Sequence, residues 1–388
     1  MADMKKEQER DELHRAIWAI ADELRGAVDG WDFKNYVLGT MFYRYISENL
    51  CNYINSGEIE AGNTDFDYAK MTDEEAEEAR EGLVQEKGFF ILPSELFCNV
   101  RARAAGDENL NETLETVFRH IEESAKGSES EGSFAGLFDD YDVNSNKLGA
   151  TVAKRNEKLV KLLNGVADMK LGDVKDHDID AFGDAYEYLM TMYASNAGKS
   201  GGEFFTPADV SELLTRLGTV GKTEVNKVYD PACGSGSLLL KAVKVLGHDA
   251  VRNGFYGQEI NITTYNLCRI NMFLHDIGFD KFDIACEDTL TNPQHWDDEP
   301  FELIVSTPPT PSSGPGMTTP CSSTTPALLP PACWPPRARR IWPLLCTASA
   351  GWRPTALPPL SVSPVLCTEA ERRRRSASIS SITTSSTV

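Results

Sequence analysis

The sequence contains no apolar run long enough to cross a membrane. Its longest apolar runs, such as 238–243, are short and interrupted, far from the ~20 residues that a membrane span needs. The N-terminal residues 1–14 lack the apolar stretch of a secretory signal peptide. The nine cysteines include no C-x-x-C pair, which suits reduced thiols better than a disulfide framework or a zinc site. We therefore expect a cytoplasmic protein without a membrane segment or a bound metal.

Basic residues are also scarce. The chain has 38 Lys and Arg residues against 59 Asp and Glu residues, which gives a formal net charge of −21. Non-specific affinity for DNA comes from neutralising phosphates, so a chain this acidic is expected to bind DNA poorly by itself. If the protein acts on DNA, a partner is expected to supply much of the contact.

The C-terminal tail, residues 307–388, lacks Asp, Asn, Gln, Lys, His, Phe and Tyr altogether. It holds 15 of the 20 prolines and carries a net charge of +6, against −27 for residues 1–306. Low-complexity disorder is one interpretation of this bias. Disordered segments are usually poor in Trp and Cys, whereas the tail keeps three Trp and four Cys. The second interpretation is translation out of frame.

Helical periodicity dominates the first part of the chain. Apolar side chains recur at helical spacing in residues 10–27, and residues 31–50 form an aromatic-rich helical run. Thr72 and Glu75 form the T-x-x-E pattern of a capping box ahead of an acidic helix. We predict a mostly helical domain over residues 1–170.

Strand-like segments alternate with helical ones from about residue 200. The expected strands are 226–230, 254–260, 282–288 and 301–306. Such alternation predicts an α/β domain with a parallel sheet flanked by helices, and ligands on such sheets bind at the carboxyl ends of the strands. We assign residues 171–306 to this domain.

The first of these strands ends at Asp230 and leads into a Gly-rich turn, DPACGSGS, at 230–237. Glycines let the main chain come close to a ligand. The turn is not a dinucleotide fingerprint, because Leu239 stands where the third Gly belongs. The chain has no P-loop either, since Tyr193 stands where GKS at 198–200 would require a Gly. A tight strand–helix turn without a ligand explains the pattern equally well.

Carboxylates and aromatic residues near the sheet are further candidates. Glu259 ends the second strand, where a carboxylate can accept both hydroxyls of a ribose; a surface Glu is the alternative. Phe204 and Phe205 lie in GGEFFTP, where they either wall an adenine or methionine pocket or pack into the core. Asp288 follows the third strand and either accepts from an adenine amine or caps a helix.

Three of these segments, GGEFFTP, DPACGSGS and GQEIN, resemble in order and spacing the S-adenosylmethionine-binding motifs of amino-group DNA methyltransferases. RAIWAIADELRG, WDFKNYVLGTMFYRYISE and FGDAYEYLM resemble the helical N-terminal domain of the methylation (M) subunit of type I restriction-modification systems. The resemblance covers about residues 10–306. It implies a helical N-terminal domain, a Rossmann-like S-adenosylmethionine-dependent methyltransferase domain that is incomplete, and a disordered tail.

The same resemblance implies a cofactor, a substrate and partners. S-adenosyl-L-methionine would bind at Glu203, Phe204, Phe205, Thr206, Pro207, Ala208, Asp230, Pro231, Gly234, Ser235, Gly236, Ser237, Glu259 and Asp288. The substrate would be the N6 amine of an adenine flipped out of duplex DNA. The implied partners are the specificity subunit, the restriction subunit and a second methylation subunit.

In this family the fourth strand ends in Asn-Pro-Pro-Tyr or Asn-Pro-Pro-Phe. The Asn oxygen and the first Pro carbonyl accept the two N6 hydrogens, and the aromatic ring stacks on the flipped base, worth roughly 1–3 kcal/mol. This chain has Thr307-Pro308-Pro309-Thr310 instead. Thr307 is shorter than Asn and Thr310 cannot stack, so we expect little or no methyl transfer.

The four residues also fit a frameshift, because the codons AAC-CCC-CCC-TAC for Asn-Pro-Pro-Tyr would encode Thr-Pro-Pro-Thr after the loss of one A. Our hypothesis is that residues 307–388 are out of frame, that the natural protein is longer, and that Arg372–Arg375 is a codon artefact. A nucleic-acid-binding patch is the alternative for that Arg run. Two alternative functions are a non-catalytic assembly module that docks the specificity subunit and a methyltransferase acting on RNA or protein.

Overall fold

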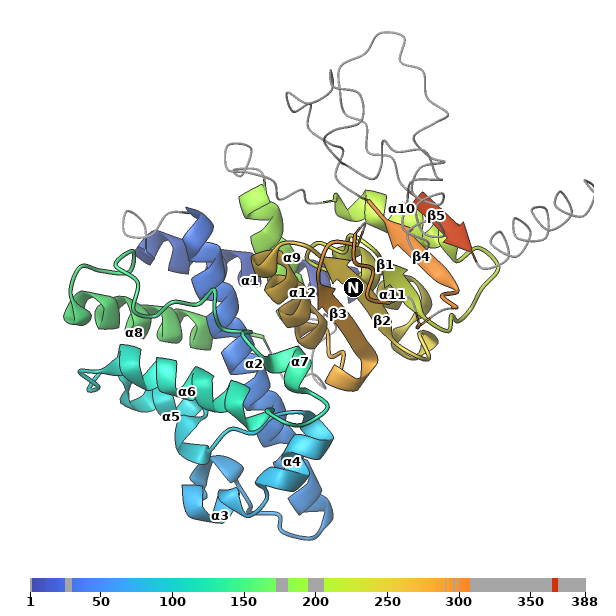
Figure 1. The fold of residues 1–388 in the computed structure, drawn as a ribbon. Coiled ribbons are helices and arrows are strands. Elements are labelled where there is room, and N and C mark those ends of the chain that lie inside the picture. The colour runs from blue at the N-terminus through green and yellow to red at the C-terminus, as the bar shows by residue number, and fades with distance from the viewer. Residues whose placement is uncertain are drawn as a thin grey trace, which may run out of the picture. The chain divides into compact units, whose positions relative to one another are not determined.

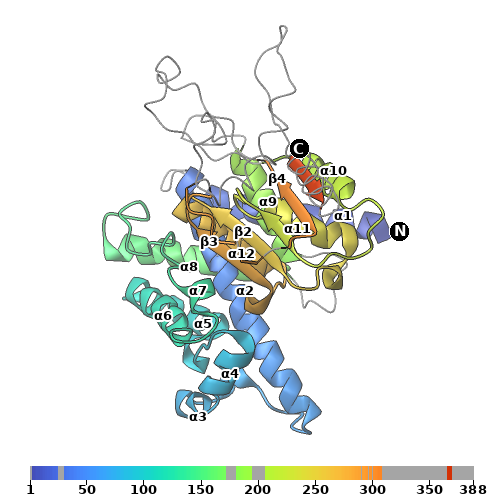
Figure 2. The same cartoon turned by 45° about the vertical axis from the view of Figure 1, so that its right-hand side comes forward.

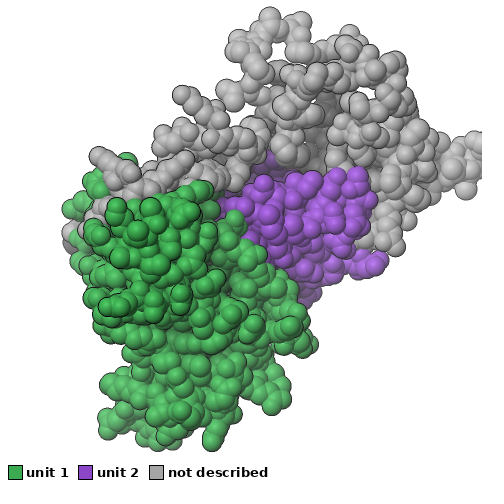
Figure 3. Space-filling model, turned by 60° about the vertical axis from the view of Figure 1, so that its left-hand side comes forward, with its two compact units in different colours: residues 1–203, 270–280 green, residues 204–269, 281–388 purple. Residues whose placement is uncertain are grey.

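The computed structural model describes residues 2–24, 30–171, 181–194, 206–289, 291–295, 297–298, 300–307 and 365–368. The chain divides into two compact units (Figure 3). Unit 1 comprises Met1–Glu203 and Ile270–Asp280, and unit 2 comprises Phe204–Arg269 and Lys281–Val388. The predicted domain limits of 1–170, 171–306 and 307–388 stay predictions. Within the described part of the chain, every helix is too short or too polar to span a membrane.

Unit 1 is helical, as the periodicity predicts (Figure 1). Its helices are α1 (Ala2–Leu24), α2 (Gly30–Glu60), α3 (Asp73–Glu77), α4 (Arg80–Lys87), α5 (Phe97–Ala104), α6 (Leu110–Ser124), α7 (Glu131–Phe134), α8 (Val152–Asp168) and α9 (Ala181–Ala194). Two 3-10 turns, η1 (Tyr68–Lys70) and η2 (Pro93–Glu95), join them. The predicted capping box is confirmed, because Thr72 and Glu75 cap the start of α3 reciprocally.

Aromatic rings fill the core of unit 1. Phe118 of α6 stacks on Phe138 at a centroid distance of 4.4 Å, and Phe42 of α2 lies 5.5 Å from Phe138. Phe273 contacts this cluster through Phe42 and Phe134. Phe273 belongs to the last turn of α12 (Ile262–Leu274), which explains why Ile270–Asp280 are part of unit 1. Stacked and edge-on rings each add about 0.5–1.5 kcal/mol beyond the area that they bury.

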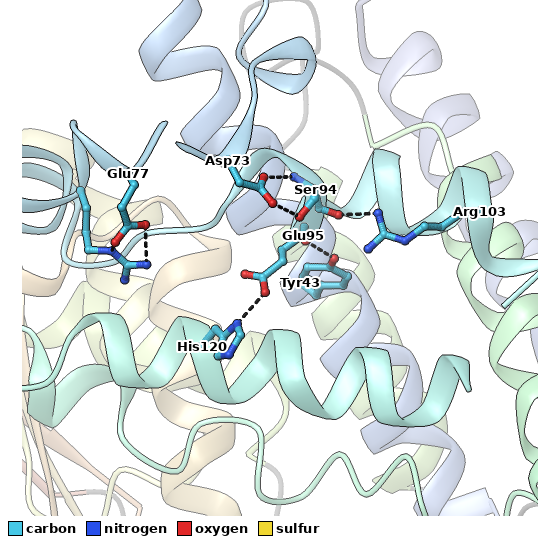
Figure 4. A network of polar contacts seen from close by, with 8 residues as sticks. Tyr43, Asp73, Glu77, Ser94, Glu95, Arg103 and His120 are labelled. Carbon is cyan, nitrogen blue, oxygen red and sulfur yellow. Dashed lines mark hydrogen bonds and ion pairs between the residues drawn. The ribbon is translucent and has the colours of Figure 1, made fainter. Parts of the chain in front are cut away.

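The turn η2 gathers four helices of unit 1 through polar contacts (Figure 4). Asp73 of α3 accepts the main-chain N–H of Ser94 at 2.9 Å and its hydroxyl at 2.6 Å. Arg103 of α5 donates to the Ser94 carbonyl at 2.7 Å. Tyr43 of α2 donates to the Glu95 carbonyl, and Nδ1 of His120 on α6 lies 2.6 Å from the Glu95 carboxylate. Four helices therefore fix the turn. Their hydrogen bonds satisfy polar groups of the turn that burial would otherwise leave without a partner.

Burial shifts the pKa of the Glu95 carboxyl within this network. Removal from water raises the pKa of its carboxyl above the ordinary value, and His120 partly offsets the rise. A buried carboxylate is tolerated where hydrogen bonds hold it, so the contact with His120 stabilises the charged form.

Unit 2 contains a sheet with the strand order β3-β2-β1-β4-β5 (Figure 1), of which β3, β2 and β4 are labelled from a second side in Figure 2. Its strands are β1 (Val228–Asp230), β2 (Phe255–Glu259), β3 (Phe282–Cys286), β4 (Leu303–Ser306) and β5 (Val365–Thr368). The first four are parallel, and Val228 pairs with Phe255 on one side and with Leu303 on the other. Helices α10 (Ala208–Gly218) and α11 (Ser237–Leu246) pack on each other and against β4. The four predicted strands are confirmed.

One strand, β5, lies within residues 307–388, and the disorder predicted for that tail stays a prediction. Val365–Thr368 pair antiparallel with β4, from Leu303↔Thr368 to Ser306↔Val365. An edge of β4 without a neighbour would present unpaired N–H and C=O groups, and an extended segment can satisfy them with its main chain whatever its side chains. Of the remaining tail, only Thr307 is described.

Two glycines of α2 offer a matched test of this packing. A Cβ on Gly39 would lie 2.8 Å from the ring of Tyr141, whereas a Cβ on Gly57 would meet nothing within 4 Å. We expect Gly39→Ala to lower the free energy of unfolding by about 1–3 kcal/mol, because the buried ring must move. We expect Gly57→Ala to raise it by about 0.5–1 kcal/mol through helix propensity. Urea denaturation of both variants checks this, and equal effects would contradict the packing described.

Candidate functional site

Three parallel strands end close together in unit 2. The chain runs from β1 through α11 to β2 on one side of β1, whereas β4 pairs with its other side. In open parallel sheets, the point where the strand order reverses creates a crevice beyond the carboxyl ends of the strands. Asp230, Glu259 and Ser306 are the last residues of β1, β2 and β4. Predicted site residues therefore stand at the position where such sheets bind ligands.

The Gly-rich turn between β1 and α11 has a left-handed main chain at two positions. Gly234 has a φ of 56° and Gly236 a φ of 79°, so both positions favour glycine. A Cβ on Gly234 would meet nothing within 4 Å. Backbone conformation, and not crowding, therefore requires glycine there, and the turn leaves its outer side open. Gly236 directly precedes α11 and has no side chain to cap it.

Glu259 is bound to this turn. Its Oε2 accepts the main-chain N–H of Gly234 at 3.0 Å, and its Oε1 accepts that of Asn261 at 2.9 Å. The side chain is half-buried and fixed by both oxygens. The alternative of a freely solvated surface Glu does not fit these contacts.

Asp230 is almost fully buried, with 1% of its surface exposed. Its Oδ1 accepts the main-chain N–H of Ala232 at 3.0 Å. Burial raises the pKa of this carboxyl from an ordinary 3.8 to about 7, although the Ala232 N–H and the Ser306 side chain hold it down. The negative charge of Glu259 adds to the rise. Asp230 is therefore a carboxyl that gains or loses its proton near neutral pH.

Close packing of side chains against Gly257 of β2 supports the turn. A Cβ on Gly257 of β2 would lie 2.9 Å from Sγ of Cys233 and 2.8 Å from Cδ1 of Ile284. The Cys233 N–H also donates to the Gln258 carbonyl at 3.0 Å. Sequence reasoning missed Gly257 as a site residue. A glycine in the interior of a strand was the signal for close packing.

The segment after β3 is attached to the same region. The buried amide of Gln258 donates to the carbonyls of Glu287 and Asn292 at 3.1 and 3.0 Å, and its oxygen accepts the Gln294 N–H at 3.1 Å. The hydroxyl of Thr289 donates to the Pro231 carbonyl at 2.5 Å. Asp288 lies half-buried in this segment. Sequence reasoning also missed Gln258 and Thr289, whose roles depend on contacts across the sheet.

Thr206 and Thr307 are in direct contact. Their hydroxyl oxygens lie 2.6 Å apart although the residues are 101 positions apart in the chain. Thr206 precedes α10 and Thr307 follows β4. The predicted pocket segment and the predicted catalytic loop therefore meet at this hydrogen bond.

The other predicted site residues have the following positions. Pro207 and Ala208 are exposed at the start of α10, Pro231 is buried after β1, and the hydroxyls of Ser235 and Ser237 lie 3.2 Å apart. Glu203, Phe204, Phe205, Pro308, Pro309 and Thr310 lie outside the described residues. The roles of all these residues stay predictions.

Among the described residues, one group has the composition of a metal site. Asp283, His295 and Asp298 place ligand atoms within 4.8 Å of one another. His295 is buried, with its Nε2 2.8 Å from the Gly257 carbonyl and its Nδ1 3.2 Å from Asp298. These contacts with protein groups account for the position of the imidazole ring beside β2.

Two family models match the chain, one described as HsdM N-terminal domain over residues 13–166 and one as N-6 DNA Methylase over residues 177–314. The chain is 50% identical to a type I restriction enzyme methylase subunit, MpnII, of Mycoplasma pneumoniae, over 79% of this chain and 59% of the relative. It is 25% identical to the MjaIX methylase subunit of Methanocaldococcus jannaschii, over 77% of this chain and 51% of the relative.

A solved structure agrees with these relatives. The methyltransferase subunit of a type I restriction-modification system from Streptococcus thermophilus matches with a TM-score of 0.63 and 31% identity. The match covers 76% of this chain and 62% of that one. The chain thus spans between half and two thirds of the length of these three proteins.

The raised pKa of Asp230 has a consequence for stability. Because the folded pKa lies above the unfolded one, folding favours the protonated carboxyl, so this stability is present at low pH and is lost as pH rises through about 7. We expect the wild type to lose up to about 4 kcal/mol relative to Asp230→Asn between pH 4 and pH 8. Urea denaturation across this range measures the difference. The exposed Asp209→Asn is the control, and a constant difference between wild type and Asp230→Asn would contradict the expectation.

Proposed function

The chain belongs to the N6 DNA methylase family as a methylase subunit of the type I restriction-modification kind, and on this basis we propose that unit 2 binds S-adenosylmethionine at the carboxyl ends of β1 and β2. The observation that carries the proposal is the fixed carboxylate of Glu259, held against the open Gly-rich turn by the Gly234 N–H. A carboxylate at this place in the fold is suited to accept the two hydroxyls of a ribose.

The chain's own residues fit the other parts of the cofactor. The open outer side at Gly234 supports close approach of a ligand to the turn, and we propose that Asp288, which follows β3, accepts from the adenine amine. Asp230 takes a negative charge near neutral pH, which favours a cationic ammonium group beside it. When bound, S-adenosylmethionine supplies a methyl group on a positively charged sulfur.

The reaction that we propose for the family's complete site is methyl transfer to the N6 amine of a flipped adenine. In this chain, the position of the expected Asn holds Thr307, whose hydroxyl lies 2.6 Å from that of Thr206. Thr307 offers no amide oxygen to accept an N6 hydrogen, and Thr310 offers no ring to stack. We therefore propose a chain that binds the cofactor and is impaired in catalysis.

The partners of the chain are proposals as well. We propose that it assembles with a specificity subunit that reads the DNA sequence, with a restriction subunit and with a second methylation subunit. The net charge of −27 over residues 1–306 supports a subunit whose grip on DNA comes from another chain. A non-catalytic assembly module is the second candidate, because the extensively packed unit 1 does not depend on Thr307. Co-purification with a specificity subunit, without any methyl transfer, would favour it.

The cofactor site is tested by removing one acceptor from Glu259. Glu259→Gln turns one of its oxygens into a donor that faces either the Gly234 or the Asn261 N–H. We expect the Kd for S-adenosylmethionine to rise about tenfold or more, equivalent to ~1.4 kcal/mol. Isothermal titration calorimetry checks this, with the exposed Glu212→Gln of α10 as the matched control. The assignment fails if both variants bind with wild-type affinity, or if the wild type binds no cofactor.

The catalytic loop is tested by restoring the family motif. We expect the wild type, mixed with its specificity subunit, duplex DNA and methyl-labelled S-adenosylmethionine, to leave DNA unlabelled. Thr307→Asn combined with Thr310→Tyr is expected to label adenine, because it restores the acceptor and the stacking ring, and each such oriented group is worth about 10²–10³ in rate. Adding Glu259→Gln to this variant provides the control, because it weakens cofactor binding and is therefore expected to reduce the labelling. Labelling by the wild type would show that the Thr residues do not impair catalysis.

A further inference from the structure

Unit 1 has a groove of about 590 Å³ beside the C-terminal end of α2, formed by residues that the methyl-transfer proposal does not use. It is bordered by α2, η1, α3 and α4. The residues that line it are Tyr53, Ile54, Ser56, Gly57, Glu58, Glu60, Phe66, Tyr68, Met71, Ala76, Ala79 and Leu83. Its volume is within the range of sites that take a few side chains or a small ligand.

The groove has a fixed apolar floor. Tyr68, Ala76 and Leu83 are buried beneath it, and Ile54 is half-buried on its wall. The Tyr68 hydroxyl donates to the Ile91 carbonyl at 2.8 Å, and its main-chain N–H donates to the Asn55 side chain at 2.8 Å. These two hydrogen bonds fix the orientation of the Tyr68 ring, so the floor of the groove is formed before any partner binds.

The charge around the groove is predominantly negative. Residues 58–86 contain eleven acidic and two basic residues, a net charge of −9. Both basic residues are already in ion pairs inside the segment, Lys70 with Asp67 at 2.9 Å and Arg80 with Glu77 at 2.5 Å. An apolar floor inside such a strongly acidic surround disfavours nucleic acid and anionic membranes as occupants, and it complements a cationic apolar ligand.

Tyr53 at the groove already attracts a cation. Nζ of Lys87 lies 4.9 Å from the centre of the Tyr53 ring, and the Tyr53 hydroxyl bonds Glu86. The ring is 43% exposed, so its outer surface remains accessible. A Lys or Arg side chain from a partner would meet both an aromatic face and carboxylates here.

From this geometry we propose that the groove is the docking site for a basic amphipathic helix of a partner protein. Apolar side chains spaced by three and four residues on one face of that helix fill the floor over Tyr68 and Leu83, and the flanking Lys and Arg residues face Glu58 and Glu60. The border of the groove consists of helices and offers no sheet edge, which favours a helix over an added strand. The proposal concerns unit 1 alone and stands whether or not the chain transfers methyl groups.

The first test uses two synthetic peptides of 18 residues with the same Leu pattern at i, i+3, i+4 and i+7. One carries Lys at all other positions and one carries Glu. Fluorescence anisotropy with the full chain is expected to show binding of the Leu/Lys peptide that weakens as salt is raised, and at least tenfold weaker binding of the Leu/Glu peptide. Absence of binding by the Leu/Lys peptide would overturn the proposal.

Matched variants separate the groove from the general acidity of the chain. Ile54 lines the groove, whereas Ile59 lies on the same helix outside it and is 49% exposed. We expect Ile54→Asp to weaken Leu/Lys binding at least tenfold and Ile59→Asp to leave it within twofold, although both add the same charge. Equal affinities for the two variants would overturn the proposal. Thermal melting of both variants verifies that unit 1 is folded.

A charge-reversal pair tests the rim in the same way. Glu60 ends α2 at the groove, and Glu123 is an exposed residue at the equivalent end of α6 outside the lining. Glu60→Lys is expected to weaken Leu/Lys binding about fivefold or more, and Glu123→Lys to change it by less than twofold. A similar loss of affinity in both variants would show that the peptide responds only to the net charge of the chain, which would contradict specific binding in the groove.

Discussion

The site in unit 2 depends on one constraint, the pairing of β1 with parallel neighbours on both sides. Because β2 and β4 run in the same direction as β1, the residues that end these strands project beyond the same edge of the sheet. Asp230, Glu259 and Ser306 are together for this reason alone. The Gly-rich turn then has only to bend back across β2, and the absent side chain of Gly257 makes room for Cys233 to do so. Loss of the β1 register would separate the carboxylates whatever their identities.

Local sequence patterns predicted the elements well, because each pattern depends on residues within one element. The strands around Asp230 and Glu259 and the cap formed by Thr72 and Glu75 follow from spacing and residue type. The contacts that bring the site residues together cannot be predicted from spacing and residue type. Thr206 meets Thr307 across 101 positions, and Gln258 holds a segment that begins nearly thirty residues later. No periodicity encodes such pairings, since they arise only once the sheet has formed.

The acidic residues are arranged differently in the two units, and the net charge of the chain does not show this difference. The overall acidity predicted only that the chain binds DNA poorly by itself. In unit 1 eleven acidic residues lie within 58–86, around an apolar groove, whereas in unit 2 the carboxylates of Asp230 and Glu259 are held by hydrogen bonds at the ends of β1 and β2. A net charge describes solubility and steering, and the position of each carboxylate relative to apolar surface decides what it can bind.

The antiparallel addition of β5 to β4 has a consequence for the order of synthesis. Main-chain groups make this pairing, so it places little demand on the identity of the side chains that enter it. A ribosome completes β4 well before it reaches residue 365, and until then this edge of β4 lacks the partner that β5 provides. During that interval the nascent chain exposes an unpaired strand edge. Nascent chains on neighbouring ribosomes of the same polysome are the nearest molecules that could pair with this edge in place of β5.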